Sequence, residues 1–386
     1  MRLAIEGSQA IARAVAMCRP QVVAAYPITP QTHIVEALAR FVANGELDCE
    51  IVSVESEFSA ASVVLGAAAA GSRAYSASAS QGILLMSEVL YNIAGQRIPL
   101  VLTCANRTVG APINIWNDQQ DSMAVRDSGC IQIYCTDNQD AVDATIQAFR
   151  IAETAELPVM VCVDGFLLTH LFEPIELPTP EQVDGFLPPY RFSRMLDPAH
   201  PLSLGTLVGP ERFVDTRRDL HAAQQRALSV IIEADAAWAE VSGRACGGLL
   251  RVEGDAEAAL GVLTLGSVFG TLIEARTALP DIPPVKLMAL RAFRPFPVDA
   301  LKEACRGLAD LVVVERALSP GAGGIVAAEV RAALSELESP PRVHGFAAGL
   351  GGRDVPLEML GRLVEAARGP RPVRFDFADL ARPAAE

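Results

Sequence analysis

The chain turns from a predicted strand into a predicted helix across Ala25, Tyr26, Pro27, Ile28, Thr29, Pro30, Gln31 and Thr32. The apolar run Val22 to Ala25 predicts a buried strand, and the residues after Thr32 predict a helix. Two prolines restrict the backbone on either side of Thr29, so the chain holds that hydroxyl in place. This stretch therefore predicts a strand-to-helix junction that presents a fixed polar group.

A second junction of the same kind follows the apolar run Ile51 to Val54, where Glu55 and Glu57 precede an alanine-rich helix. A carboxylate in the first turn of a helix is stabilised by the helix dipole by roughly 0.3 to 1 kcal/mol, so a purely structural acid is one interpretation of both residues. Open α/β sheets, however, bind ligands at the carboxyl ends of their strands. Thr29 and Glu57 are therefore candidates for ligand contact.

Alternation of short apolar runs with longer amphipathic ones predicts an α/β fold with two parallel-sheet domains. Residues 1–243 form the predicted first domain, and a proline-rich segment over 173–212 within it excludes regular helix or central strand. A long polar helix spans 214–241, and residues 244–386 form a smaller, also parallel, second domain. The predicted strands are Val22 to Ala25, Ile51 to Val54, Arg73 to Ser76, Leu100 to Cys104, Ile131 to Cys135, Val159 to Val163, Gly261 to Leu265, Val285 to Leu290, Leu311 to Val314 and Arg342 to Phe346.

The composition excludes several classes of protein. A net charge of −14 argues against nucleic-acid and anionic-membrane partners, and no signal peptide or membrane span is evident in the 386 residues, so we predict a cytoplasmic protein. The eight cysteines contain no Cys-x-x-Cys pair, which argues against an iron-sulfur cluster or zinc ribbon in this chain. The five histidines show no metal-ligand spacing, and no metal site is expected.

Two further junctions and one loop carry polar side chains. Small hydroxyl residues and Gln81 surround Ser80 before a helix, which suits either close ligand approach or simple capping. Asn106 and Arg107 follow another buried strand, and the guanidinium fork of Arg107 matches a carboxylate, with a surface ion pair as the alternative. The loop that follows contains Asn117, Asp118 and Asp121, with Arg126 a turn later, and predicts either a ligand contact or an interface. No Gly-x-Gly-x-x-Gly follows the first strand, so a nicotinamide dehydrogenase is poorly supported.

Taken in order, these segments resemble the alpha subunit of the pyruvate:ferredoxin oxidoreductase family, also called 2-oxoacid:ferredoxin oxidoreductases. The resemblance covers essentially the whole chain. The segments that carry it are Glu6 to Ala10, Tyr26 to Thr32, Glu55 to Glu57, Ser80 to Gly82, Ala105 to Arg107, Asn114 to Asp121, Arg126, Asp164 to Phe166, Leu196 to Pro198, Arg294 to Pro297 and Ser319 to Gly321.

The resemblance implies a thiamine-diphosphate pyrimidine-binding domain followed by a transketolase C-terminal-like domain, with the cofactor shared with a beta subunit. Glu57 would hydrogen-bond the aminopyrimidine and promote its imino tautomer, Thr29 would lie near the substrate carbonyl, and Arg107 would hold the substrate carboxylate. The implied cofactor contacts are Glu57, Tyr26, Pro27, Ser80, Gln81 and Asn92. The implied substrate or interface residues are Ile28, Asn106, Asn117, Asp118, Asp121 and Arg126.

The same resemblance implies oxidative decarboxylation of a 2-oxoacid with coenzyme A as co-substrate. Mg²⁺ and [4Fe-4S] clusters would lie on partner subunits: the beta subunit, gamma and delta subunits or their equivalents, and ferredoxin or another acceptor. Pyruvate is the expected substrate. The family often has Asp-His-x-Asp where this chain has Asp118, Gln119, Gln120 and Asp121, so an aromatic 2-oxoacid such as phenylglyoxylate is an alternative, and 2-oxoglutarate and oxalate stay open. A non-catalytic scaffold subunit is the alternative of another class.

Overall fold

The computed structural model describes residues 2–380, so the last six residues of the predicted second domain lie outside the described part. Its first sheet has seven strands in the order β12, β6, β7, β5, β4, β2, β3. All neighbours pair in parallel except β12, which runs antiparallel to β6. The strands are β2 (Val22–Ala25), β3 (Glu50–Ser53), β4 (Ala74–Ser78), β5 (Leu100–Asn106), β6 (Ile131–Tyr134), β7 (Pro158–Asp164) and β12 (Ala292–Arg294).

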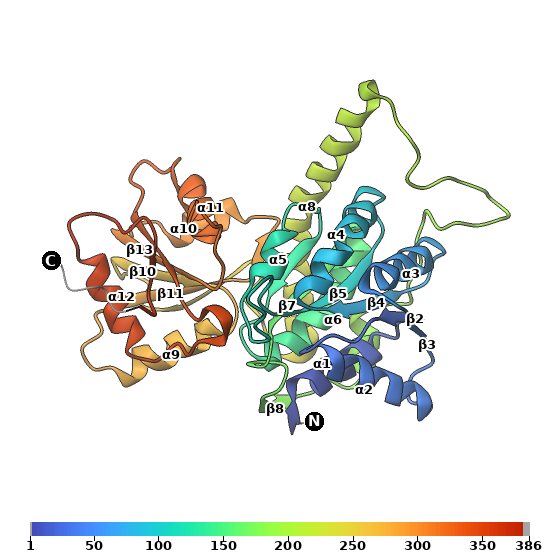
Figure 1. The fold of residues 1–386 in the computed structure, drawn as a ribbon, viewed down its shortest axis with the longest axis horizontal. Coiled ribbons are helices and arrows are strands. Elements are labelled where there is room, and N and C mark those ends of the chain that lie inside the picture. The colour runs from blue at the N-terminus through green and yellow to red at the C-terminus, as the bar shows by residue number, and fades with distance from the viewer. Residues whose placement is uncertain (1, 381–386) are drawn as a thin grey trace.

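Helices cover both faces of this sheet, as its uninterrupted apolar strands require (Figure 1). On one face, α1 (Gly7–Met17), α2 (Thr32–Ala43) and α6 (Asn138–Ala155) enclose one apolar core. On the other face, α3 (Glu57–Ala69) and α4 (Ser80–Gly95) pack on a second core. A short helix, α5 (Gln120–Ala124), follows the loop after β5.

A second sheet of six strands has the order β15, β14, β13, β10, β11, β9. Its strands are β9 (Leu250–Gly254), β10 (Leu260–Thr264), β11 (Val285–Leu290), β13 (Asp310–Glu315), β14 (Arg342–Ala347) and β15 (Asp376–Phe377). Its helices are α9 (Val268–Ala278), α10 (Val298–Ala304), α11 (Ile325–Leu334) and α12 (Met359–Ala367). The predicted α/β class with two parallel-rich sheets is confirmed.

The four predicted strands of the second sheet pair in parallel, whereas β9, which was not predicted, pairs antiparallel with β11. An antiparallel edge strand needs no crossover helix, so the chain can enter the sheet directly from the helix before it. The two sheets also share apolar packing: one core cluster joins Met86 and Leu102 to Met288 and Val313. The predicted boundary after residue 243 falls between α8 and β9 and stays a prediction.

The proline-rich segment is more regular than its composition predicts. It contains a short helix, α7 (Pro180–Phe186), with Pro180 in the first turn, where the missing amide hydrogen costs no helical hydrogen bond. It also contains most of β8 (Phe172–Glu176), which pairs antiparallel with β1 (Arg2–Glu6) in a separate two-stranded sheet. The exclusion of helix was therefore wrong, whereas a central strand is indeed absent from the described part of this segment.

Beyond α7 the chain makes a long excursion away from the body before α8 (Pro210–Ser242), whose first turns protrude from the molecule (Figure 1). This helix corresponds to the predicted polar helix and starts four residues earlier. Within residues 2–380, no helix combines the length and the apolar character that a membrane crossing requires. All eight cysteines are free, and all but Cys49 are buried.

Candidate functional site

The loops after neighbouring parallel strands of the first sheet open at one edge. Strand β2 leads into the loop over 26–31, β3 into Glu57, β4 into Ser80, β5 into Arg107 and β7 ends at Asp164. Adjacent strands lie about 4.8 Å apart, so the segments after β3, β2 and β4 begin within roughly 10 Å of one another. The predicted polar groups at the strand ends therefore gather at one edge.

Glu57 is the first residue of α3 and is only 7% exposed. Its carboxylate lies against the first turn of α4, where a Cβ added to Gly82 would come 2.7 Å from Glu57 Oε1 and still closer to Ser78 Oγ. Among residues 2–380, no hydrogen bond or ion pair engages the Glu57 carboxylate, and Ser78 Oγ is buried without a partner. The Glu57 carboxylate and the Ser78 hydroxyl thus lie close together without protein hydrogen-bond partners, which is rare for buried polar groups.

The loop that presents Thr29 is anchored from inside the sheet. The Gln31 side chain donates from Nε2 to Ala77 O at 2.8 Å and accepts from the Ile28 backbone. The side chain of Arg107 donates from Nη1 to Thr29 O at 3.0 Å, so the two predicted substrate contacts lie side by side. Its Nε is buried without a partner, and burial lowers the pKa of the guanidinium. Arg107 thus has a free donor at the edge where Thr29 is exposed.

The buried Asp121 carboxylate holds the segments of this edge together through hydrogen bonds. Its Oδ2 accepts from the backbone amides of Ser80 (2.8 Å) and Arg107 (3.0 Å), and its Oδ1 accepts from Asn106 Nδ2 (2.7 Å) and the Ser122 amide (2.8 Å). Burial raises the pKa of Asp121, while the hydrogen bonds from Asn106, Ser80 and Arg107 oppose the rise. Asp121 and Asn106 have no exposed surface, so they position the edge rather than form its surface. Their predicted substrate or interface contact stays a prediction.

A buried hydrogen-bond network around Arg316 and Asp164, here called the polar clasp, joins this edge to the second sheet. Arg316, which follows β13, donates from Nη1 to Asn117 Oδ1 (2.9 Å), Asp164 Oδ2 (3.0 Å) and Ser267 Oγ (3.2 Å). Gln119, at the position where the family often has histidine, donates from Nε2 to Asp164 Oδ1 at 3.1 Å and has no exposed surface. No site role was predicted for Asp164 or Arg316. Asp164 ends strand β7 and Arg316 directly follows strand β13, and this strand-end position is the sequence signal that would have identified both residues.

Asp118 lies beside this clasp, and its burial raises its pKa from 3.8 to about 7. Because the folded-state pKa lies above the unfolded one, the stability linked to this group is complete at low pH and is lost as the pH rises through 7. In Asp118→Asn, the amide oxygen can still accept from the Gln120 amide, which now bonds Asp118 Oδ1 at 3.0 Å. We expect this variant to melt at least about 2 °C above the wild-type chain near pH 8 and to show no such gain near pH 4. Thermal unfolding followed by circular dichroism at both pH values checks this. A gain of equal size at both pH values would contradict it.

The remaining predicted site residues fall into two groups. Tyr26, Pro27 and Gln81 are exposed, and Ile28 is partly exposed, on the loops of the same edge. Asn92 is exposed on α4 but lies roughly 18 Å along that helix from Ser80, and its cofactor contact stays a prediction.

Arg126 faces the second sheet unit rather than the strand ends. Its Nη1 donates to Met123 O at 2.8 Å, and its Nε lies 3.7 Å from Glu329 Oε1 on α11. The structure thus brings Glu57, Thr29, Arg107 and Ser80 to one edge and separates Arg126 from it.

The fold is of the kind found in transketolase-type proteins. A split-gene transketolase, solved as an inactive beta4 tetramer, superposes with a TM-score of 0.54 and 12% identity over 95% of this chain and 98% of that one. Residues 13–236 match the thiamine-diphosphate-binding family of pyruvate flavodoxin/ferredoxin oxidoreductases, and residues 258–360 match pyruvate:ferredoxin oxidoreductase core domain II. The chain belongs to the pyruvate:ferredoxin oxidoreductase family, which confirms the resemblance seen in the sequence.

Relatives of known name are similar over nearly their whole length. The pyruvate synthase subunit PorA of Methanosarcina barkeri is 41% identical over 97% of this chain and 96% of its own. The ketoisovalerate oxidoreductase subunit VorA of Pyrococcus abyssi is 36% identical over 91% and 89%. The 2-oxoglutarate:ferredoxin oxidoreductase of Magnetococcus marinus, solved with 2-oxoglutarate, coenzyme A and succinyl-CoA bound, has a TM-score of 0.71 and 21% identity. This chain is covered to 94% in that comparison and spans 65% of that protein's chain.

Proposed function

We propose that this chain is the alpha subunit of a thiamine-diphosphate-dependent 2-oxoacid oxidoreductase that oxidatively decarboxylates pyruvate, or runs the reverse synthesis, with coenzyme A as co-substrate. The observation that carries the proposal is the Glu57 carboxylate, which is buried and without a hydrogen-bond partner among the described residues. The names of the relatives support pyruvate, because pyruvate synthase subunits stand at 40 to 43% identity and the ketoisovalerate subunit at 36%.

The residues around Glu57 suit the aminopyrimidine of thiamine diphosphate. The ring edge of this group offers nitrogen donors and acceptors, and the unpartnered Ser78 Oγ and the Glu57 carboxylate offer complementary atoms. Gly82 lets both groups pack against the first turn of α4, since a Cβ there would strike both side chains. Bound thiamine diphosphate supplies the nucleophile and the electron sink that let a 2-oxoacid lose carbon dioxide.

The role of Glu57 in this proposal is to hold a proton at the pyrimidine ring nitrogen. A carboxyl group can both donate and accept that proton, which an amide cannot do. Its position in the first turn of α3 fixes its backbone, and its low exposure keeps competing water away from the bond.

Thr29 and Arg107 form the substrate side of the proposed site. The Arg107 guanidinium uses Nη1 on the Thr29 carbonyl, which leaves Nη2, bonded by no described residue, for a carboxylate. A 2-oxoacid has a carboxylate next to a ketone, so the Thr29 hydroxyl, held on the neighbouring loop, would meet the ketone oxygen. The arrangement binds and orients the substrate and leaves proton transfer to other groups.

Arg107→Lys tests the substrate side. An ammonium group cannot reproduce the guanidinium fork, so one of the two contacts should be lost. We expect the KM for the 2-oxoacid to rise at least about tenfold with a smaller fall in kcat, measured by dye reduction in the assembled complex. Arg40→Lys is the matched control, because Arg40 is exposed on α2 and its side chain bonds, among the described residues, only the Gln9 side chain. An unchanged KM in Arg107→Lys would rule out the carboxylate contact.

Partner subunits complete the proposed enzyme. The described cysteines are scattered and mostly buried, so the iron-sulfur clusters are assigned to the partners, together with Mg²⁺ and the diphosphate contacts of a beta subunit. Gamma and delta subunits or their equivalents would pass electrons to ferredoxin or another acceptor. The exposed residues Tyr26, Pro27, Thr29 and Trp116 supply contact surface for such a partner. Cytoplasmic location stays a prediction.

A substrate panel tests the proposal directly. The chain is purified with its partner subunits and assayed with pyruvate, 2-oxoisovalerate, 2-oxoglutarate and phenylglyoxylate, with coenzyme A and a dye acceptor. We expect the highest kcat/KM for pyruvate and no turnover without coenzyme A. A higher value for phenylglyoxylate would move the assignment to an aromatic 2-oxoacid. Absence of turnover with every 2-oxoacid would favour a scaffold subunit.

A further inference from the structure

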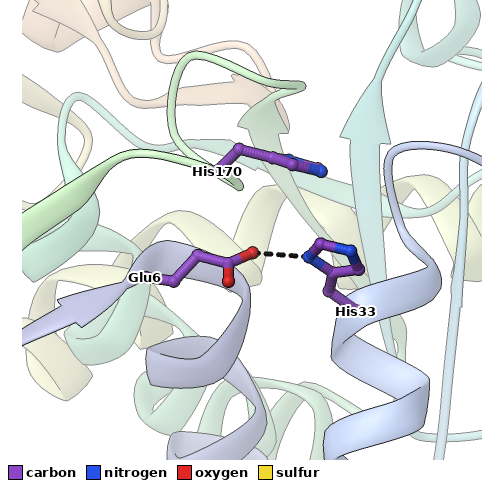
Figure 2. Close-up of side chains that lie close together, drawn as sticks. All are labelled: Glu6, His33 and His170. Carbon is purple, nitrogen blue, oxygen red and sulfur yellow. Dashed lines mark hydrogen bonds and ion pairs between the residues drawn. The ribbon is translucent and has the colours of Figure 1, made fainter.

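Three side chains that the sequence gives no reason to connect converge beside the candidate site. Glu6 is the last residue of β1, His33 lies in the first turn of α2, and His170 lies in the loop between β7 and β8 (Figure 2). One ligand atom from each lies within 4.8 Å of the others. From this convergence we propose that Glu6, His33 and His170 form a binding site for one divalent transition-metal ion of the Zn²⁺ class.

The backbone fixes two of these residues relative to each other. The amide of Gly7 donates to Leu171 O at 3.0 Å, and the amide of Ser8 donates to Thr169 O at 2.9 Å. The two acceptors flank His170, and the two donors follow Glu6 directly. The pairing of β1 with β8 continues this contact, with Glu6 opposite Phe172. Glu6 and His170 are therefore held together by main-chain hydrogen bonds rather than by their own side chains.

The three side chains lie against one another, but the stacked imidazole rings must turn before their nitrogens can share one ion (Figure 2). His33 Nδ1 lies 2.6 Å from Glu6 Oε1, and the rings of His33 and His170 lie 4.7 Å apart. The Thr169 hydroxyl lies 2.7 Å from His170 Nδ1, so it can accept from that nitrogen and leave Nε2 as the ligand atom of His170. The ring of Phe166 packs against the ring of His170, with the two ring centroids 4.7 Å apart.

The chemistry of the ligands selects the class of ion. Two imidazoles and one carboxylate are typical ligands of Zn²⁺ and of other late first-row divalent ions. Such ligands bind Zn²⁺ at about 2.0–2.2 Å, so ligand atoms in a tetrahedral site lie roughly 3.3–3.6 Å apart. Shifts of about 1 Å in the Glu6 and His170 side chains would give these separations. The His33 side chain is 44% exposed, which leaves a path for the ion and a position for water as the fourth ligand.

Deprotonation of the imidazoles favours metal binding at this cluster. Burial lowers the pKa of His170, and the neighbouring His33 lowers it further, while Glu6 opposes the shift. A neutral imidazole has a free lone pair for a metal, and acidification should release the ion as the imidazoles take up protons.

The position of the proposed ion links it to the candidate site. His33 follows the loop that carries Thr29, and His170 belongs to the segment after β7, whose Gly165 packs against Pro30 and Asn106. An ion bound by both histidines would join these two segments on either side of Pro30. It would thereby restrain the loop that presents Thr29.

Zn²⁺ titration of the full chain by calorimetry tests the proposal, with His33→Asn and His170→Asn as site variants. His200→Asn is the matched control, because His200 also pairs with a carboxylate, Asp197, at 3.1 Å but is exposed on the excursion before α8. We expect one equivalent of Zn²⁺ to bind the wild-type chain and the control alike. Each site variant should bind at least about tenfold more weakly. Equal affinity in all four proteins would overturn the assignment.

Two measurements on the wild-type chain keep the test independent of how well the variants fold. Co²⁺ should give visible absorption bands without thiolate charge transfer, because no cysteine belongs to the cluster. Zn²⁺ should raise the melting temperature, and EDTA should reverse the rise. Thiolate bands, or no saturable Zn²⁺ uptake, would each contradict the proposal. None of these readouts depends on turnover, so the metal site and the proposed oxidoreductase activity can fail separately.

Discussion

Replacing Glu57 by Gln is expected to lower kcat of the assembled complex by at least about a hundredfold. Gln has nearly the same size, and no ion pair is lost, since none reaches the Glu57 carboxylate within the described residues. The amide cannot hold and release a proton at the pyrimidine ring nitrogen, however, so the cofactor should bind without being activated. Dye-linked turnover and deuterium exchange at the cofactor C2 position, followed by NMR, measure the two effects.

Glu55→Gln is the matched control for this experiment. Glu55 lies two residues earlier, is exposed, and its carboxylate contacts the Ser59 hydroxyl. We expect its turnover to stay within about twofold of the wild-type value, as usual for a surface substitution. If Glu57→Gln and Glu55→Gln both retained full turnover and C2 exchange, the catalytic assignment of Glu57 would be lost and the scaffold alternative would gain support.

Gly82→Ala should also remove most activity, with an expected loss of at least about tenfold. The added Cβ would come 2.7 Å from Glu57 Oε1 and would press on Ser78 as well. Real Cβ atoms do not approach so closely, so the Glu57 side chain must leave its position or α4 must shift. Kinetics of the assembled complex, combined with urea unfolding of the variant chain, would separate a displaced carboxylate from a loss of fold.

The same helix offers a control for Gly82→Ala. Gly95 lies at the other end of α4, and a Cβ there would meet no atom within 4 Å. Gly95→Ala should leave turnover unchanged and raise the free energy of unfolding by up to about 1 kcal/mol, because alanine favours helix more than glycine does. Equal losses of turnover in both variants would show that the effect belongs to the helix and not to the space beside Glu57.

Most of the central strands could be predicted because their signal is local. A run such as Ile131–Tyr134 is short, apolar and followed by an amphipathic helix, which is sufficient to place a buried parallel strand. Strand β12 could not be predicted in this way, because its three residues pair with β6 from a distant part of the sequence. Strand β8 carries Pro174, which argues against a strand unless the strand lies in a two-stranded ribbon, as it does here.

In the candidate site, the residues that directly follow a strand could be predicted in the same way, and the others could not. Glu57, Thr29 and Arg107 follow predicted strands, so both their chemistry and their place in the fold can be read locally. The function of Asp121 depends on four donors that arrive from three segments, and no spacing in the sequence encodes that arrangement. The same holds for Glu6 and His170, which are brought together by the pairing of β1 with β8 and the main-chain bonds next to it.

The pairing of β12 with β6 has a consequence for any attempt to divide the protein. The chain leaves the second sheet after β11, places Ala292 and Arg294 on the outer edge of the first sheet, and then returns. The neighbouring Arg291 is buried and bonds Asp140 of the first unit at 2.6 Å. A fragment that stops near residue 243 would therefore leave the outer edge of β6 unpaired and Asp140 buried without its cation. Such an open sheet edge invites pairing with other chains, so expression of the two halves separately is a route to aggregation.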